Sequence, residues 1–214
     1  MMETKGLKRS IYTIGGLVLL IIFQHLITIF HADIIIFEFA NDFCVLVLFM
    51  IFLAQLVINF KLYLKVENIK MKIMVLGISY SFMLVLAEII KFTVKTSSDN
   101  SINSLSFYTA GLIFLIFLVF LIIICGQYIR IGNVFYKINL KEMKRLAYSM
   151  YFMPLMFAVI LVFPIFEILK PYQQIFIIIE LSPYWFVYKI YKKILNGEFN
   201  ADLIRSSETS NSIK

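Results

Sequence analysis

Residues 107–129 read FYTAGLIFLIFLVFLIIICGQYI and contain no charged side chain. A helix rises about 1.5 Å per residue, so a segment of this length crosses the roughly 30 Å hydrocarbon core of a bilayer. Five other apolar segments have comparable length and few charges, at residues 10–32, 43–60, 73–95, 146–169 and 174–194. The sequence therefore predicts an all-α, polytopic integral membrane protein, with a single domain of six transmembrane helices over residues 1–195.

The composition agrees with this class of protein. Of the 214 residues, 61% are hydrophobic and 15% are charged, and the mean hydropathy is +0.90. Soluble domains are closer to half apolar and a quarter charged, whereas lipid accommodates an apolar exterior. The net charge of +7 does not indicate a nucleic-acid partner, because the basic residues lie in short clusters between apolar segments.

The basic residues also predict the orientation, since they concentrate in the cytoplasmic loops of membrane proteins. With a cytoplasmic N-terminus, six spans leave nearly all of the 20 basic residues inside, and the exceptions are Lys91, Lys95 and Lys170. The outer connections carry acids instead: Asp33, Glu38, Asp42 and Asp99. We therefore expect a multi-pass protein of the cell (plasma) membrane with both ends in the cytoplasm, and a polar, disordered cytoplasmic tail over residues 196–214.

Three glutamates interrupt the predicted spans, where ionisable side chains are costly and are candidates for function. Glu88 and Glu167 each have a lysine three residues later, and a local ion pair along one helix face accounts for both. Glu180 lies about 10 Å from the outer end of the sixth span and has no basic residue at that spacing. We expect it to be protonated or matched by a group on another helix.

Gln24 and His25, in the outer half of the first span, are candidates for that group. His25 with several glutamates could in principle bind a divalent metal, but the chain lacks HxxxH or HExxH spacing. A histidine in a span more often makes an interhelical hydrogen bond. We therefore predict ligand or ion binding at Glu180, Glu88, Glu167, His25 and Gln24, with no metal and no cofactor.

Pro164 and Pro183 are predicted to kink the fifth and sixth spans, each three residues from a glutamate. A proline inside a helix leaves the carbonyl four residues back without its usual partner, here Ile160 and Ile179. In transporters such carbonyls coordinate ions, and elsewhere the kinks simply aid packing. The inner connection 130–147 is expected to hold a short surface helix, which contacts lipid or docks a cytoplasmic partner.

No GxSxG, HExxH, paired intramembrane aspartate or Walker A pattern occurs, so we expect no enzyme and no catalytic residue. The leading hypothesis is binding or transport of a small solute or ion through an outer-leaflet acidic site, alone or as the membrane subunit of a transporter. The alternative is a bacteriocin or peptide immunity protein, or a sensory or accessory protein, without transport activity. The expected partners are the lipid bilayer, a second copy of the chain or a separate membrane or ATPase subunit.

Overall fold

The computed structural model describes residues 2–29, 35–64, 66, 69–98, 104–138, 140–162 and 173–198. They form six helices: α1 (Met2–Ile29), α2 (Ile35–Leu64), α3 (Lys70–Ser98), α4 (Ser104–Lys137), α5 (Lys141–Val162) and α6 (Gln173–Leu195). The described part of the chain contains no strand. The all-helical class predicted from the apolar segments is thereby confirmed.

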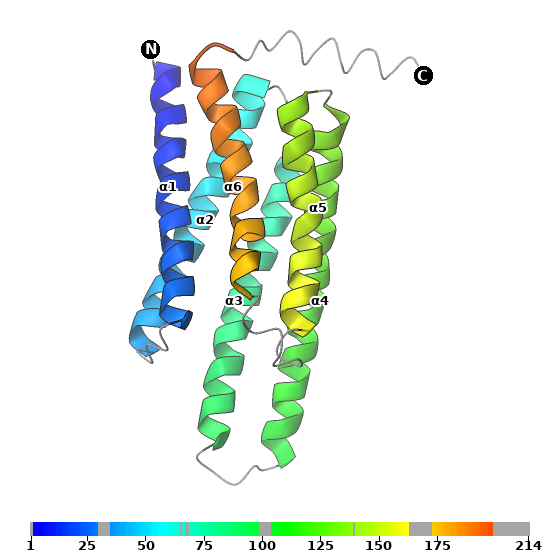
Figure 1. The fold of residues 1–214 in the computed structure, drawn as a ribbon. Helices are drawn as coiled ribbons and strands as arrows, with labels where there is room; N and C mark the ends of the chain where they lie inside the picture. Colours follow the sequence, from blue (N-terminus) through cyan, green and yellow to red (C-terminus); the bar gives the residue numbers. More distant parts are fainter. Residues whose placement is uncertain are drawn as a thin grey trace.

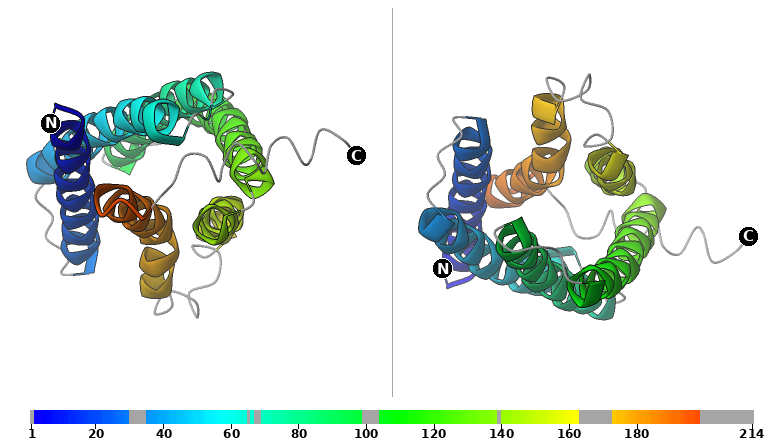
Figure 2. Two further views of the ribbon diagram at one scale, coloured as in Figure 1. Left: turned by 90° about the horizontal axis from the view of Figure 1, so that it is seen from above. Right: turned by 90° about the horizontal axis from the view of Figure 1, so that it is seen from below.

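The helices run alternately up and down, and each packs against the next one in the chain (Figure 1). Contacts between α1 and α6 close the arrangement into a ring (Figure 2). The start of α1 and the end of α6 lie together at one end, which we call the N-terminal end of the bundle. At the other end, which we call the far end, α1 finishes and α6 begins, and α3 and α4 extend beyond both.

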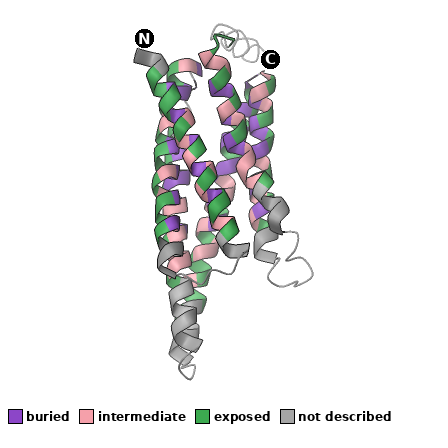
Figure 3. Cartoon of the chain, turned by 60° about the vertical axis from the view of Figure 1, so that its left-hand side comes forward, coloured by how far each residue is buried: buried purple, intermediate pink, exposed green. Residues whose placement is uncertain are grey.

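Buried side chains face the interior of the ring, while exposed ones cover its outside (Figure 3). The interior is apolar and aromatic, with Phe60, Phe135 and Tyr191 fully enclosed. The outside is also apolar: Leu19, Ile122 and Ile178 are 68%, 70% and 72% exposed. Large apolar side chains over so much of the surface are compatible with a lipid surrounding and not with water.

Four helices are long and apolar enough to cross a membrane, over Lys5–Leu26, Ala40–Leu64, Lys70–Ile89 and Gly111–Lys137 of the described residues. The fifth and sixth predicted spans do not meet that criterion within the described residues. The described part of α5 begins with the charged run KEMKR. The last residues of the predicted fifth span, 163–169, lie outside the described ranges. The count of six spans therefore stays a prediction.

The prediction of a surface helix within residues 130–147 is wrong. The helix α4 continues to Lys137, and α5 already begins at Lys141. The spacing of apolar residues in this stretch reflects packing within the bundle, because Ile138 and Met143 are buried in the core.

At the end of α6, Gly197 adopts a left-handed conformation (φ 71°), and its N–H donates to the Ile194 carbonyl in a cap that terminates the helix. Most of the tail, residues 199–214, lies outside the described residues.

Candidate functional site

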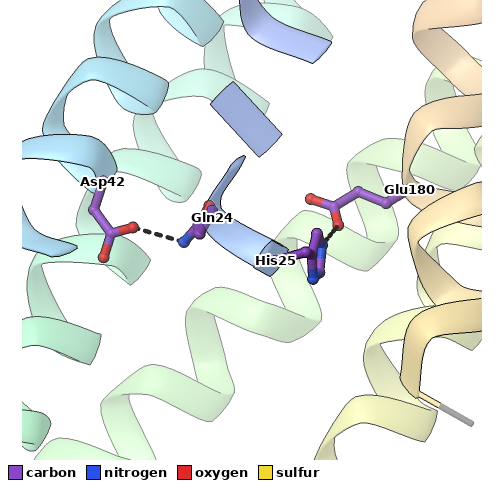
Figure 4. A network of polar contacts seen from close by, with 4 residues as sticks. All are labelled: Gln24, His25, Asp42 and Glu180. Atoms are coloured by element: carbon purple, nitrogen blue, oxygen red, sulfur yellow. Dashed lines mark hydrogen bonds and ion pairs between the residues drawn. The ribbon is translucent and has the colours of Figure 1, made fainter. Parts of the chain in front are cut away.

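The end of α1 carries two adjacent polar side chains that point toward different neighbouring helices (Figure 4). Gln24 is directed to α2 and His25 to α6, since successive residues of a helix differ by about 100° in direction. Both contacts lie toward the far end of the bundle, where α1 finishes and α6 begins. One turn of α1 thus connects three helices through polar groups.

The contact on the α6 side joins two residues that sequence analysis proposed separately. His25 Nε2 lies 3.0 Å from Glu180 Oε2, within hydrogen-bond and ion-pair distance. The His25 and Glu180 side chains remain 36% and 25% exposed. The expectation that Glu180 meets a group on another helix therefore agrees with the geometry, and the group is the imidazole of His25.

The contact on the α2 side involves an acid that sequence analysis treated only as part of an outer connection. Gln24 Nε2 donates to Asp42 Oδ1 at 2.6 Å. Asp42 belongs to α2, which begins at Ile35 and so starts earlier than the predicted span 43–60. Its position in the sequence could have indicated this contact. Asp42 immediately precedes a long apolar run, and in an antiparallel pair of helices the start of the second helix lies beside the end of the first, where Gln24 is located.

Tyrosines form the inner side of the site, and sequence analysis did not identify them. Tyr184 follows Glu180 by one turn of α6, and it lines the same small cavity as Tyr128 of α4. Tyr80 packs against Phe49, with ring centroids 4.6 Å apart, and Tyr184 packs against Phe52 at 5.2 Å. These rings line or adjoin an apolar cavity of about 20 Å³, which is enough for about one water molecule. Along α6, Tyr184 and its aromatic packing partner therefore lie on the side of Glu180 that is nearer the N-terminal end of the bundle.

Pro183 lies inside α6, and the carbonyl that it deprives of a partner belongs to Ile179, as the sequence predicts. The hydroxyl of Ser182 donates to this carbonyl at 2.7 Å. Neighbouring Ser and Thr side chains commonly compensate for prolines in membrane helices in this way. In this structure the Ile179 carbonyl is therefore satisfied within its own helix, which weakens the case for it as an ion ligand.

The remaining candidates are not part of the His25–Glu180 contact. Glu88 is half-buried on α3, and the side chain of Lys91, its predicted partner, lies outside the described side chains. Glu167 and Pro164 fall outside the described residues altogether. In the part of the chain that the structure describes, no group of three or more His, Cys, Asp or Glu side chains is placed to hold a metal ion.

A second set of polar contacts lies toward the N-terminal end. Asn59 donates to Ser10 at 2.8 Å, which ties α2 to α1. Lys193 donates to Glu142 at 2.6 Å and joins α6 to α5. This hydrogen bond lowers the pKa of Glu142 below its usual value. These contacts connect helices, as interhelical side-chain hydrogen bonds commonly do in membrane bundles.

The arrangement at the far end can therefore exchange a proton between an imidazole and a carboxylate, or present a carboxylate to a small cation. The side chains of both groups are partly exposed. Comparisons of the chain with protein-family models, with curated proteins and with solved structures find no match.

Proposed function

We propose that this protein is a non-enzymatic, six-span protein of the cell membrane that binds a small cation, a proton included, at His25 and Glu180 in the outer half of the bilayer. Both ends of the helical domain lie in the cytoplasm in this proposal. The distribution of charge supports it: apart from Lys91 and Lys95 of α3, the described basic residues gather at the N-terminal end, at the starts of α1, α3 and α5 and the ends of α2, α4 and α6.

The observation that carries the proposal is the 3.0 Å contact between His25 and Glu180 across α1 and α6. A carboxylate in a membrane helix is costly unless it is paired, and here its partner is the imidazole of His25. A proton or a small cation can replace the imidazole as the partner of Glu180 without leaving the carboxylate uncompensated. The partial exposure of both side chains provides access for that exchange.

In this proposal the access is from one side. Tyr184 follows Glu180 by one turn toward the N-terminal end, and the rings of Tyr80 and Tyr184 pack on Phe49 and Phe52. The proposed ligand therefore enters from the far end, which the proposed topology assigns to the outside. Passage across the bundle would require these rings to move apart, and α6 is the element suited to that movement because Pro183 removes one of its backbone hydrogen bonds.

In this proposal, cation binding at His25 and Glu180 is the first step of transport. Transport also needs either a second copy of the chain or a separate energy-supplying subunit. The immunity or sensory alternative depends on the outer acidic connections, and Asp33 and Asp99 lie outside the described residues, as does the side chain of Glu38. It stays a prediction from the sequence, and the identity of neighbouring genes would discriminate between the two.

The test compares thermal unfolding of the purified protein and of Glu180→Gln in detergent, across chlorides of monovalent metals, divalent metals and small organic ammonium ions at constant ionic strength. A ligand of the native state at 100 times its dissociation constant stabilises by about 2.7 kcal/mol, so binding raises the midpoint measurably. We expect at least one cation to stabilise the wild-type chain and to have no such effect on Glu180→Gln.

The matched control is Glu142→Gln, which removes a carboxylate at the opposite end of the bundle and should leave the response intact. The Glu167→Gln variant should matter less than Glu180→Gln, because the sequence places Lys170 three residues away. If no cation stabilises the wild-type chain, or if Glu180→Gln responds as wild type does, the proposed site is wrong.

A further inference from the structure

A groove outside the His25–Glu180 contact runs between α1 and α6, which lie side by side (Figures 1 and 2). It has a volume of about 920 Å³. From α1 its walls include Tyr12, Gly15 and Leu19, and from α6 they include Ile178 and Trp185. All five are exposed, so the groove is open along the outside of the bundle.

The walls of the groove are almost entirely apolar. Ser182 is one of the lining residues, and its hydroxyl already donates to the Ile179 carbonyl of its own helix. Along α6 the lining residues extend from Ile178 to Tyr188, about 15 Å at 1.5 Å per residue. That length equals one leaflet of a hydrocarbon core about 30 Å thick.

The end of the groove nearest the N-terminal end of the bundle is basic. Lys189 follows Trp185 by one turn, and its ammonium lies 5.0 Å from the centroid of the Trp185 ring. Lys8 precedes Tyr12 by one turn on the same face of α1, and it is exposed. Two cations thus flank the mouth of an apolar groove that has the depth of a single leaflet.

We propose that this groove binds one anionic phospholipid, with an acyl chain between α1 and α6 and its phosphate between Lys8 and Lys189. The complementarity is of two kinds: the apolar walls match a hydrocarbon chain in length, and the lysines match the negative headgroup. Basic pockets between membrane helices on the cytoplasmic side are suited to such headgroups, and each lysine near an anionic surface strengthens binding several-fold. This inference does not depend on cation binding at Glu180.

Native mass spectrometry of the full-length chain tests the proposal, with dioleoylphosphatidylglycerol and dioleoylphosphatidylcholine added separately to the detergent micelle. The two lipids share acyl chains and differ in headgroup charge. We expect the wild-type chain to retain the anionic lipid preferentially, and Lys8→Gln with Lys189→Gln to reduce that preference at least about tenfold. The control is Lys141→Gln, an exposed lysine at the same end of the bundle on α5, which should leave the preference unchanged.

A second variant tests the groove itself. A Cβ atom at Gly15 would meet nothing within 4 Å, so Gly15→Phe fills the groove without a clash at its first atom and should reduce retention of both lipids. Gly111→Phe, at an equally open and exposed position of α4, is the control and should retain them.

Equal retention of the two lipids by the wild-type chain would overturn the proposal. So would an equal loss on Lys141→Gln, which would show only a general attraction of the basic end for anions. A dimer that carries no lipid and dissociates on Gly15→Phe would assign the groove to a second copy of the chain instead.

Discussion

Glu180 and His25 are 155 residues apart in the chain, and each lacks a charged partner on its own helix at the spacing of one turn. The lack of a charged neighbour at i+3 or i+4 can be read directly from the sequence, and sequence analysis therefore detected it. It could not decide between Gln24 and His25 as the partner, since adjacent residues point about 100° apart and the rotation of α1 about its axis is set by packing. The same uncertainty hid Asp42, which turns out to face Gln24.

At this scale we predict a measurable coupling between the two side chains. His25→Ala and Glu180→Ala should each destabilise the fold, and the double variant should lose about 1 kcal/mol less than the sum, as for other interhelical hydrogen bonds in membrane proteins. The measurement is a double-mutant cycle from equilibrium unfolding in mixed micelles. A parallel cycle of His25→Ala with Glu142→Ala provides the reference for no coupling, and purely additive losses at His25 and Glu180 would contradict the contact.

At the scale of single elements, α6 shows how a proline is accommodated. The sequence correctly indicates that Pro183 leaves the Ile179 carbonyl without its helical partner. It also contains the compensating group, since Ser182 immediately precedes the proline, but which carbonyl a serine bonds depends on its rotamer. The extent of α4 was harder to predict, because charged residues such as Arg130 and Lys137 end a membrane span without ending the helix.

The Ser182 contact gives a prediction that belongs to α6 alone. Ser182→Ala should cost about 1 kcal/mol of unfolding free energy, because it leaves a half-buried carbonyl without a donor. In a Pro183→Ala background the same change should cost close to nothing, since the restored backbone N–H of residue 183 can bond Ile179. Unfolding of the four chains in mixed micelles measures both values. An equal cost in the two backgrounds would show that the hydroxyl does not compensate for the proline.

At the scale of the whole molecule, the six apolar segments predict helices, and an even number of alternating helices predicts that α1 begins where α6 ends. The closure of the ring through α1 and α6 does not follow from the sequence, because six antiparallel helices can also pack as an open layer or as two stacked pairs. That closure matters for function: it brings His25 to Glu180 toward the far end, and it creates the apolar groove between the same two helices.

In the proposed topology, the His25–Glu180 site lies in the outer half of the membrane and opens to the outside. Thiol accessibility in intact cells tests it most directly, in a chain whose native cysteines are replaced by Cys44→Ala and Cys125→Ala. The reagent is a small, membrane-impermeant methanethiosulfonate that carries a trimethylammonium group. We predict that Glu180→Cys reacts in intact cells, whereas Lys193→Cys reacts only after permeabilisation. Reaction of Lys193→Cys from outside, with Glu180→Cys silent, would contradict the account.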